Sequence, residues 1–208
     1  MGEVVAKTRR RRRSPEEASA EIIAAAEALL RERPFREMTV DEVMRRTELS
    51  RPSFYVYFQD RHHLVLRVVE HLAAEFFIPS EPWFTASENG IATAREALEG
   101  VVDMYDLHGP VLRALADAAT DDQDVERAYN NLIQTFVDAT AKHIADEIEA
   151  GGIAPLDPQE AARALTLMNE RYLSDALGRE PRTPREKVIE TLVAIWTRTL
   201  YPHGTASR

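Results

Sequence analysis

The fold of this chain is decided by residues 38–58, which read Met38-Thr39-Val40-Asp41-Glu42-Val43-Met44, then Arg45-Arg46-Thr47-Glu48, then Leu49-Ser50-Arg51-Pro52-Ser53-Phe54-Tyr55-Val56-Tyr57-Phe58. Thr39 followed by Glu42 has the form of a capping box, which marks the start of a helix. Ser50 has the form of a second N-cap, and Pro52 falls in the first turn, where its missing N–H costs little. Two short helices joined by a turn of about three residues match helix-turn-helix geometry.

The two sides of this motif carry different side chains. The apolar residues can face a preceding helix and form a small core; they are Val40, Val43, Leu49, Phe54 and Phe58. Arg51 offers a fork that fits a guanine edge, Ser53 can bond a base or a phosphate, and the tyrosine hydroxyls can reach phosphates. The candidate DNA contacts are Thr39, Ser50, Arg51, Ser53, Tyr55, Tyr57 and Arg61, with Arg11 and Arg12 of the N-terminal segment. Helix-turn-helix topology also occurs without DNA, and this alternative stays open.

The rest of the chain also predicts helices, because glycine is scarce at eight residues and no segment alternates apolar and polar residues as a strand does. A helix from Pro15 to about residue 33 precedes the motif, and a long helix starts after an N-cap at Asp60. Pro79 and Pro82 break or bend the chain near Trp83. Later helices are expected over 90–107, 110–119, 122–150, 158–178 and 184–200. The expected fold is all-α, with about nine helices.

Charge divides the chain into parts. The net charge is −9, from 26 Lys or Arg and 35 Asp or Glu, yet residues 1–13 carry +5 and the remainder −14. Residues 1–71 sum to +2 and residues 72–208 to −11. A basic end on an acidic body suggests a polyanion at that end, although a basic tail can also serve only solubility. The predicted domains are a flexible basic arm (1–15), a helix-turn-helix DNA-binding domain (16–67) and a ligand-binding and dimerisation domain (68–208).

Several classes of function find little support. The chain has no cysteine, which excludes disulfides and thiol nucleophiles. No apolar run of about 18 residues exists, so we expect no membrane span and a cytoplasmic protein, associated with the nucleoid when bound to DNA. The histidines at 62, 63 and 71 do not form a metal site, because His63 and His71 lie about two helical turns apart and no third ligand at convincing spacing joins them. Without a phosphate-binding loop or a nucleophile with recognisable partners, we expect neither a cofactor nor an enzyme.

Residues 16–67 resemble the DNA-binding domain of the TetR (tetracycline-repressor) family, through the string from Leu49 to Phe58 with Asp60-Arg61 and Leu64. The sequence departs from the family pattern at Arg61, where lysine is usual, and at Thr47-Glu48-Leu49, which lacks the common turn glycine. The C-terminal half is similar to the EthR branch of that family; the matching strings are Leu165-Thr166-Leu167-Met168-Asn169-Glu170-Arg171 and Thr191-Leu192-Val193-Ala194-Ile195-Trp196. This resemblance implies a homodimeric repressor that releases a double-stranded operator when a small apolar or amphipathic molecule occupies the C-terminal bundle.

The last helix has two apolar stripes, one containing Leu192 and Ile195 and the other Val193 and Trp196. A helix that is apolar on both sides needs two apolar neighbours. The segments 158–178 and 184–200 of two subunits can form a four-helix dimer interface. A buried central helix in a monomer is the alternative.

Asn169 should point inward, either as an interhelical hydrogen bond or as a polar contact in a mostly apolar ligand pocket. The resemblance favours the pocket and places Trp196, Ile133, Phe136 and Thr140 around it. The full set of candidate ligand contacts is Asn169, Trp196, Phe136, Ile133, Thr140, Thr166, Tyr105 and Met168. A rival function is a helical protein–protein adaptor whose basic tail contacts an acidic partner.

Overall fold

The computed structural model describes residues 13–85, 90–120 and 122–202, and within these ranges the chain is all-helical, as the sequence predicts. It has nine α-helices and two short 3-10 helices in the described ranges. In chain order they are α1 (Pro15–Glu32), η1 (Phe35–Glu37), α2 (Val40–Arg45), α3 (Arg51–Tyr57), α4 (Arg61–Phe77), η2 (Ile78–Ser80), α5 (Glu81–Thr85), α6 (Gly90–Ala119), α7 (Gln123–Glu149), α8 (Pro158–Leu177) and α9 (Arg185–Leu200).

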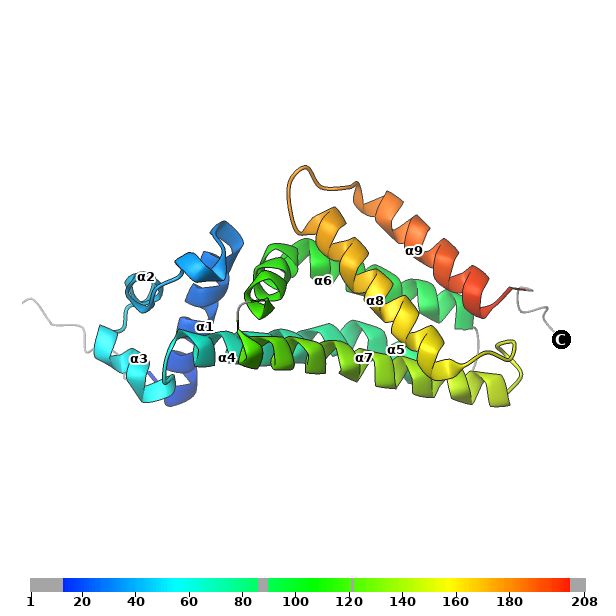
Figure 1. Cartoon of the computed structure of the whole chain (residues 1–208), viewed down its shortest axis with the longest axis horizontal. Coiled ribbons are helices and arrows are strands. Elements are labelled where there is room, and N and C mark those ends of the chain that lie inside the picture. The colour runs from blue at the N-terminus through cyan, green and yellow to red at the C-terminus, as the bar shows by residue number, and fades with distance from the viewer. Residues whose placement is uncertain (1–12, 86–89, 121, 203–208) are drawn as a thin grey trace, which may run out of the picture.

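The molecule is elongated, with a head formed by α1, α2 and α3 at one end (Figure 1). Helix α4 leaves the head and runs beside α7 into the body, which is formed by α5 to α9. Helix α8 runs diagonally across the body, and α9 lies beside it on the side far from the head. The head is therefore joined to the body by one continuous helix and by the packing of α1 against α6.

The helix starts in the head are fixed by side chains. Thr39 accepts a hydrogen bond from the backbone N–H of Glu42 at 3.3 Å, and the Glu42 carboxylate accepts one from the N–H of Thr39 at 3.2 Å. This reciprocal pair is the capping box that the sequence predicts. Asp60 accepts hydrogen bonds from the N–H groups of His62 and His63 at 2.8 and 2.9 Å, and so caps α4.

Helix α6 departs from expectation. The sequence predicts a break at Gly109-Pro110, and this prediction is wrong because α6 continues through both residues. Pro110 has no N–H to donate to the carbonyl four residues earlier. That carbonyl, on Asp106, instead accepts a 2.9 Å hydrogen bond from the guanidinium of Arg182, which lies in the segment between α8 and α9. A distant side chain thus replaces the bond that proline removes.

Gly109 serves helix packing rather than a break. A Cβ at this position would lie 3.1 Å from the carbonyl oxygen of Leu177 and 3.2 Å from Cα of Gly178. Both distances are shorter than ordinary van der Waals contact, so glycine allows α6 to approach the end of α8 closely. Gly109-Pro110, where the sequence predicts a helix break, is therefore the point at which α6 packs against the end of α8.

The segment around Trp83 contains the predicted break and a short helix as well. The prolines at 79 and 82 predict a break or bend here, and α4 ends at Phe77 and is followed by η2 and the short helix α5. Trp83 is 3% exposed, with its ring 4.2 Å from that of His143 and 5.5 Å from that of Trp196. Burial of this ring against α7 and α9 holds a helix too short to form on its own.

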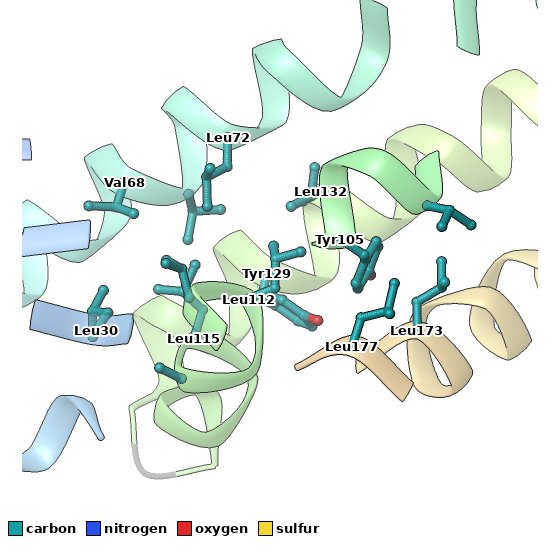
Figure 2. Close-up of a cluster of buried hydrophobic side chains, with 14 of the residues drawn as sticks. Leu30, Val68, Leu72, Tyr105, Leu112, Leu115, Tyr129, Leu132, Leu173 and Leu177 are labelled. Carbon is teal, nitrogen blue, oxygen red and sulfur yellow. The ribbon is translucent and has the colours of Figure 1, made fainter. Parts of the chain in front are cut away.

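The hydrophobic core continues from the head into the body. Figure 2 shows Leu30 of α1 beside Val68 and Leu72 of α4, followed by Leu115 of α6 and Leu132 of α7. The five residues are each at most 8% exposed. The head is too small to bury much apolar surface alone, and sharing a core with the body resolves that deficit.

Candidate DNA-binding surface and ligand cavity

Helix α3 presents one face to solvent and one to the head. Phe54 and Phe58 are fully or almost fully buried, whereas Tyr55 is 53% exposed and Val56 is 75% exposed. Arg51 forms an ion pair with the carboxylate of Asp41 on α2, and its guanidinium lies 5.9 Å from the centre of the Tyr55 ring. The exposed side of α3 therefore carries an arginine fork beside an aromatic ring.

The serines at the start of α3 are also at the surface. Ser50 is exposed, and its hydroxyl lies 2.8 Å from that of the half-buried Ser53. Tyr57 is half-buried, with its ring 6.5 Å from that of Phe58. Ser50, Ser53 and Arg51 thus lie together at the N-terminal end of the helix, while Tyr57 packs at the other end.

Two other candidate DNA contacts are engaged within the head. Arg61 is half-buried; it donates hydrogen bonds to the carbonyls of Arg36 and Met38 at 3.3 and 3.2 Å and lies 4.8 Å from the ring of Phe35. Its guanidinium therefore ties η1 to the start of α4. Thr39 is exposed, but its hydroxyl is used in the capping box.

Arg11 and Arg12 lie outside the described residues. The neighbouring Arg13 forms ion pairs with Glu21 at 3.0 Å and Glu48 at 2.7 Å. These contacts place the beginning of the described chain against the head.

Val56 is an exposed residue of α3 that the sequence reasoning did not single out. It lies on the same outward face as Pro52 and Tyr55, one helical turn after the first of them. An apolar side chain in this position is suited to contact a thymine methyl group. The signal that could have found it is helical spacing relative to the buried Phe54.

The body encloses a cavity between α5, α6, α7, α8 and α9. The space open to the centre of a water molecule is about 80 Å³, and the whole hollow with its mouth is about 790 Å³. One water needs roughly 10–15 Å³ by the first measure, so several waters or a small organic molecule fit. The residues that line it are Ser80, Trp83, Phe84, Ala94, Ala97, Leu98, Val101, Tyr105, Leu112, Tyr129, Leu132, Ile133, Phe136, Thr140, Thr166, Asn169, Glu170 and Trp196.

Seven of the eight candidate ligand contacts are in this wall; they are Asn169, Trp196, Phe136, Ile133, Thr140, Thr166 and Tyr105. Met168 is not among the lining residues and packs, half-buried, against the core. The wall also contains residues that the sequence reasoning did not propose as ligand contacts, among them Trp83 of α5 and Glu170 of α8. Glu170 lies one helical turn after Thr166, a candidate residue that also lines the wall, and this spacing is the signal that could have found it.

Polar groups occur at defined points of this largely apolar wall. The indole N–H of Trp196 donates a 3.0 Å hydrogen bond to Oδ1 of Asn169, and the hydroxyl of Tyr129 donates one of 2.8 Å to Glu170. Burial, with a smaller contribution from the Glu170 carboxylate, raises the pKa of Tyr105. The pKa of Tyr129 is raised as well, mainly by burial. Both hydroxyls are therefore neutral donors at neutral pH.

The described part of the chain gives no indication of a metal centre, since no three His, Asp or Glu side chains there are grouped to hold an ion. Within the same ranges no helix is long and apolar enough to cross a membrane. The exposed face of α3 and the cavity of the body are thus the two features on which a function can be built.

Comparison with known proteins agrees with this architecture. Residues 22–68 match the family model described as bacterial regulatory proteins, tetR family, and residues 94–202 match the model of the C-terminal domain of the transcriptional regulator EthR. The chain therefore belongs to the TetR family of helix-turn-helix transcriptional regulators, whose members are regulators and not enzymes. Within that family it belongs to the EthR branch.

Its relatives cover nearly all of the chain. It is 31% identical over 188 residues to the HTH-type transcriptional regulator EthR of Mycobacterium tuberculosis, covering 86% of this chain and 85% of the relative. It is 30% identical over 209 residues to EthR of Mycolicibacterium smegmatis, covering 94% and 93%. Among solved structures, a regulatory protein TetR from Rhodobacter sphaeroides has a TM-score of 0.71 at 21% identity, covering 88% of this chain and 98% of the other. A TetR-like regulator from a Rhodococcus species has a TM-score of 0.72 at 18% identity, covering 90% and 97%.

Proposed function

We propose that this regulator is a repressor that binds a palindromic operator as a homodimer and releases it when a small, largely apolar molecule fills the cavity of the body. The observation that carries this proposal is the shared helix α6. Its residues Leu98, Val101 and Tyr105 line the cavity. One turn further along α6, His108 lies against α1 and α4. Helix α6 thus lines the ligand cavity and also contacts α1 and α4, the helices that hold the head on the body.

The contacts of His108 define how the two ends are joined. Its Nδ1 lies 3.5 Å from the guanidinium of Arg31 on α1, and its Nε2 lies 3.3 Å from the carboxylate of Glu75 on α4. Ligand that shifts α6 would disturb these contacts and change the spacing of the two heads in a dimer. The available energy is the difference in ligand affinity between the two conformations.

For DNA, we propose that α3 enters the major groove, within a DNA-binding domain formed by residues 16–67. Arg51 would exchange its Asp41 partner for a guanine edge, with Ser53, Tyr55 and Tyr57 on bases or phosphates. Thr39, Ser50 and Arg61 would contact the backbone, and the arm (1–15) would follow the minor groove through Arg11 and Arg12. The remainder, 68–208, would bind ligand and form the dimer.

The dimer is supported by the outward face of the body. Leu167 on α8 is 48% exposed and Ile195 on α9 is 37% exposed, although both are large and apolar. Ala164 is exposed on the same side of α8. Two copies of this face related by a twofold axis would form an isologous four-helix interface.

The test is a gel-shift titration of full-length protein on the DNA upstream of its own gene, repeated with a ligand library. Arg51→Ala and Tyr55→Ala should each remove specific binding, while size-exclusion chromatography still gives a dimer. Arg127→Ala, a matched change on the exposed side of α7, should bind as the unchanged protein does. Retained operator binding by both α3 variants would overturn the assignment.

The rival function, an adaptor whose basic tail contacts an acidic protein, gives a different result in the same assay. Binding that depends on DNA sequence and falls steeply with salt excludes it, because an adaptor has no reason to distinguish base pairs.

A further inference from the structure

The wall of the cavity carries one formal charge. Of its eighteen lining residues in the described part of the chain, seventeen are apolar, aromatic, or neutral and polar, and the remaining one is Glu170. No Lys, Arg or His of the described ranges comes within ion-pair distance of this carboxylate. A lone acid in a mostly apolar cavity gives the site a negative potential that no cation of the described ranges offsets by a direct ion pair.

The contacts of Glu170 hold its carboxylate in place without neutralising it. The Tyr129 hydroxyl donates a hydrogen bond of 2.8 Å to it, and the Ser174 hydroxyl lies at 3.5 Å from the same oxygen. Hydroxyl donors stabilise a carboxylate by hydrogen bonding but carry no positive charge. The negative charge of Glu170 also acts on two neighbouring tyrosines, because it contributes, after burial, to the raised pKa of Tyr105 and of Tyr129.

Aromatic rings supply the second element of the site. Six of the lining residues are aromatic; they are Trp83, Phe84, Tyr105, Tyr129, Phe136 and Trp196. The faces of such rings attract cations, most strongly where water is excluded. A carboxylate and several aromatic rings around one small volume favour a ligand with an apolar body and one positive charge. The same arrangement opposes an anion such as a fatty acid.

Resting on the proposed function of the cavity as the ligand site, we propose that its ligand is a lipophilic amine whose protonated nitrogen pairs with Glu170. The apolar part of the amine would pack between Phe136 on α7 and Trp196 on α9. Thr140 and Thr166, which are 3% and 8% exposed, would offer hydroxyls to any polar group along the body of the ligand.

The chain provides its own reporter for a test. It contains two tryptophans, Trp83 and Trp196, and both line the cavity. Intrinsic fluorescence of the full-length protein therefore follows occupation of the site. Three probes of matched shape differ only at the end group: 4-phenylbutylamine, 4-phenylbutan-1-ol and 4-phenylbutyrate, each titrated at pH 7.

The amine is expected to bind at least tenfold more tightly than the alcohol, with the carboxylate the weakest. Glu170→Gln keeps the shape of the side chain and an acceptor for Tyr129, so alcohol binding should stay the same while the advantage of the amine falls below threefold. Glu160→Gln, on an exposed position of α8, is the matched charge control and should change none of the three affinities.

The inference fails if the alcohol binds as tightly as the amine, if the amine does not bind, or if its advantage survives in Glu170→Gln. None of these results touches the wider proposal of a ligand-controlled repressor, which a neutral ligand would satisfy equally. That proposal fails separately, if the amine binds through Glu170 and leaves operator affinity unchanged in a gel-shift titration.

Discussion

The indole N–H of Trp196 on α9 donates a 3.0 Å hydrogen bond to the side-chain oxygen of Asn169 on α8. Both residues also line the cavity. The sequence offered two alternatives for Asn169, an interhelical hydrogen bond or a polar group facing a pocket. They are compatible, because the bond joins the two helices at the edge of the hollow and so fixes part of its wall.

Replacement of Trp196 by phenylalanine should therefore affect stability and ligand response together. Phenylalanine keeps a ring but removes the N–H, which leaves the Asn169 oxygen without its donor at a cost of about 1–3 kcal/mol. Urea unfolding measures this loss, and the ligand-induced rise in Tm should shrink in the same variant. If the bond is responsible, Trp196→Phe should cost much less in an Asn169→Leu background, and equal costs in the two backgrounds would contradict it.

The bond between Arg182 and the Asp106 carbonyl predicts an unusual rescue. Arg182→Ala should lower the free energy of unfolding by about 0.5–1.5 kcal/mol, because the carbonyl that Pro110 cannot serve loses its protein donor at an exposed position. Pro110→Ala restores an N–H at the correct position of α6. Arg182→Ala should consequently cost less when combined with Pro110→Ala, as urea unfolding of the four proteins of this cycle would measure. A cost that is the same in both backgrounds would mean that the carbonyl is not the important partner.

The ion pair between Arg51 and Asp41 predicts a variant with stronger DNA binding. Both side chains are more than half exposed, and such surface pairs contribute roughly 0–1 kcal/mol to stability. Asp41→Asn frees the guanidinium and removes a negative charge that would lie close to phosphates. We expect binding to duplex DNA to tighten about three- to tenfold in fluorescence anisotropy at moderate salt.

Glu126→Gln, an exposed change on α7, controls in that experiment for the general effect of removing one negative charge. Binding by Asp41→Asn that is no tighter than binding by this control would show that Asp41 neither competes for Arg51 nor repels the DNA.

The local parts of this structure could be predicted from the sequence because their signals are local. The capping box of Thr39 and Glu42, the proline in the first turn of α3 and the Asp60 cap each act within four residues. The continuity of α6 could not be predicted in this way. Its compensating donor, Arg182, is 76 residues from Asp106 in the sequence. No sequence pattern around Pro110 indicates that Arg182 donates this hydrogen bond.

The two candidate sites differ in the same way: the DNA-binding surface depends on local signals, and the cavity depends on contacts between distant segments. The exposed side of α3 follows from helical spacing, although polar residue type, which predicts the other DNA contacts, does not indicate Val56. The wall of the cavity comes from five helices and η2, and resemblance to a family supplied four of the eight candidate residues. Trp83 was missed because it lies on α5, a five-residue helix that depends on tertiary packing.

Two buried histidines predict how stability depends on pH. Burial lowers the pKa of His108 and of His143 below the usual value of 6.5, and this effect exceeds the opposing attraction of Glu75 and Glu147 respectively. The unfolded chain therefore binds protons more readily than the folded chain below about pH 6.5, so the free energy of unfolding falls as the pH drops through this region. Each histidine can contribute a slope of up to about 1.4 kcal/mol per pH unit.

Urea unfolding at pH 8, 7, 6 and 5.5 measures this slope. His108→Gln and His143→Gln should each flatten it, and the double variant should flatten it most, because glutamine takes up no proton in either state. The variants will lose stability at pH 8, where both histidines are neutral in the folded protein, so the comparison rests on the slope and not on the absolute value. An unchanged slope in the double variant would show that other groups control the response to acid.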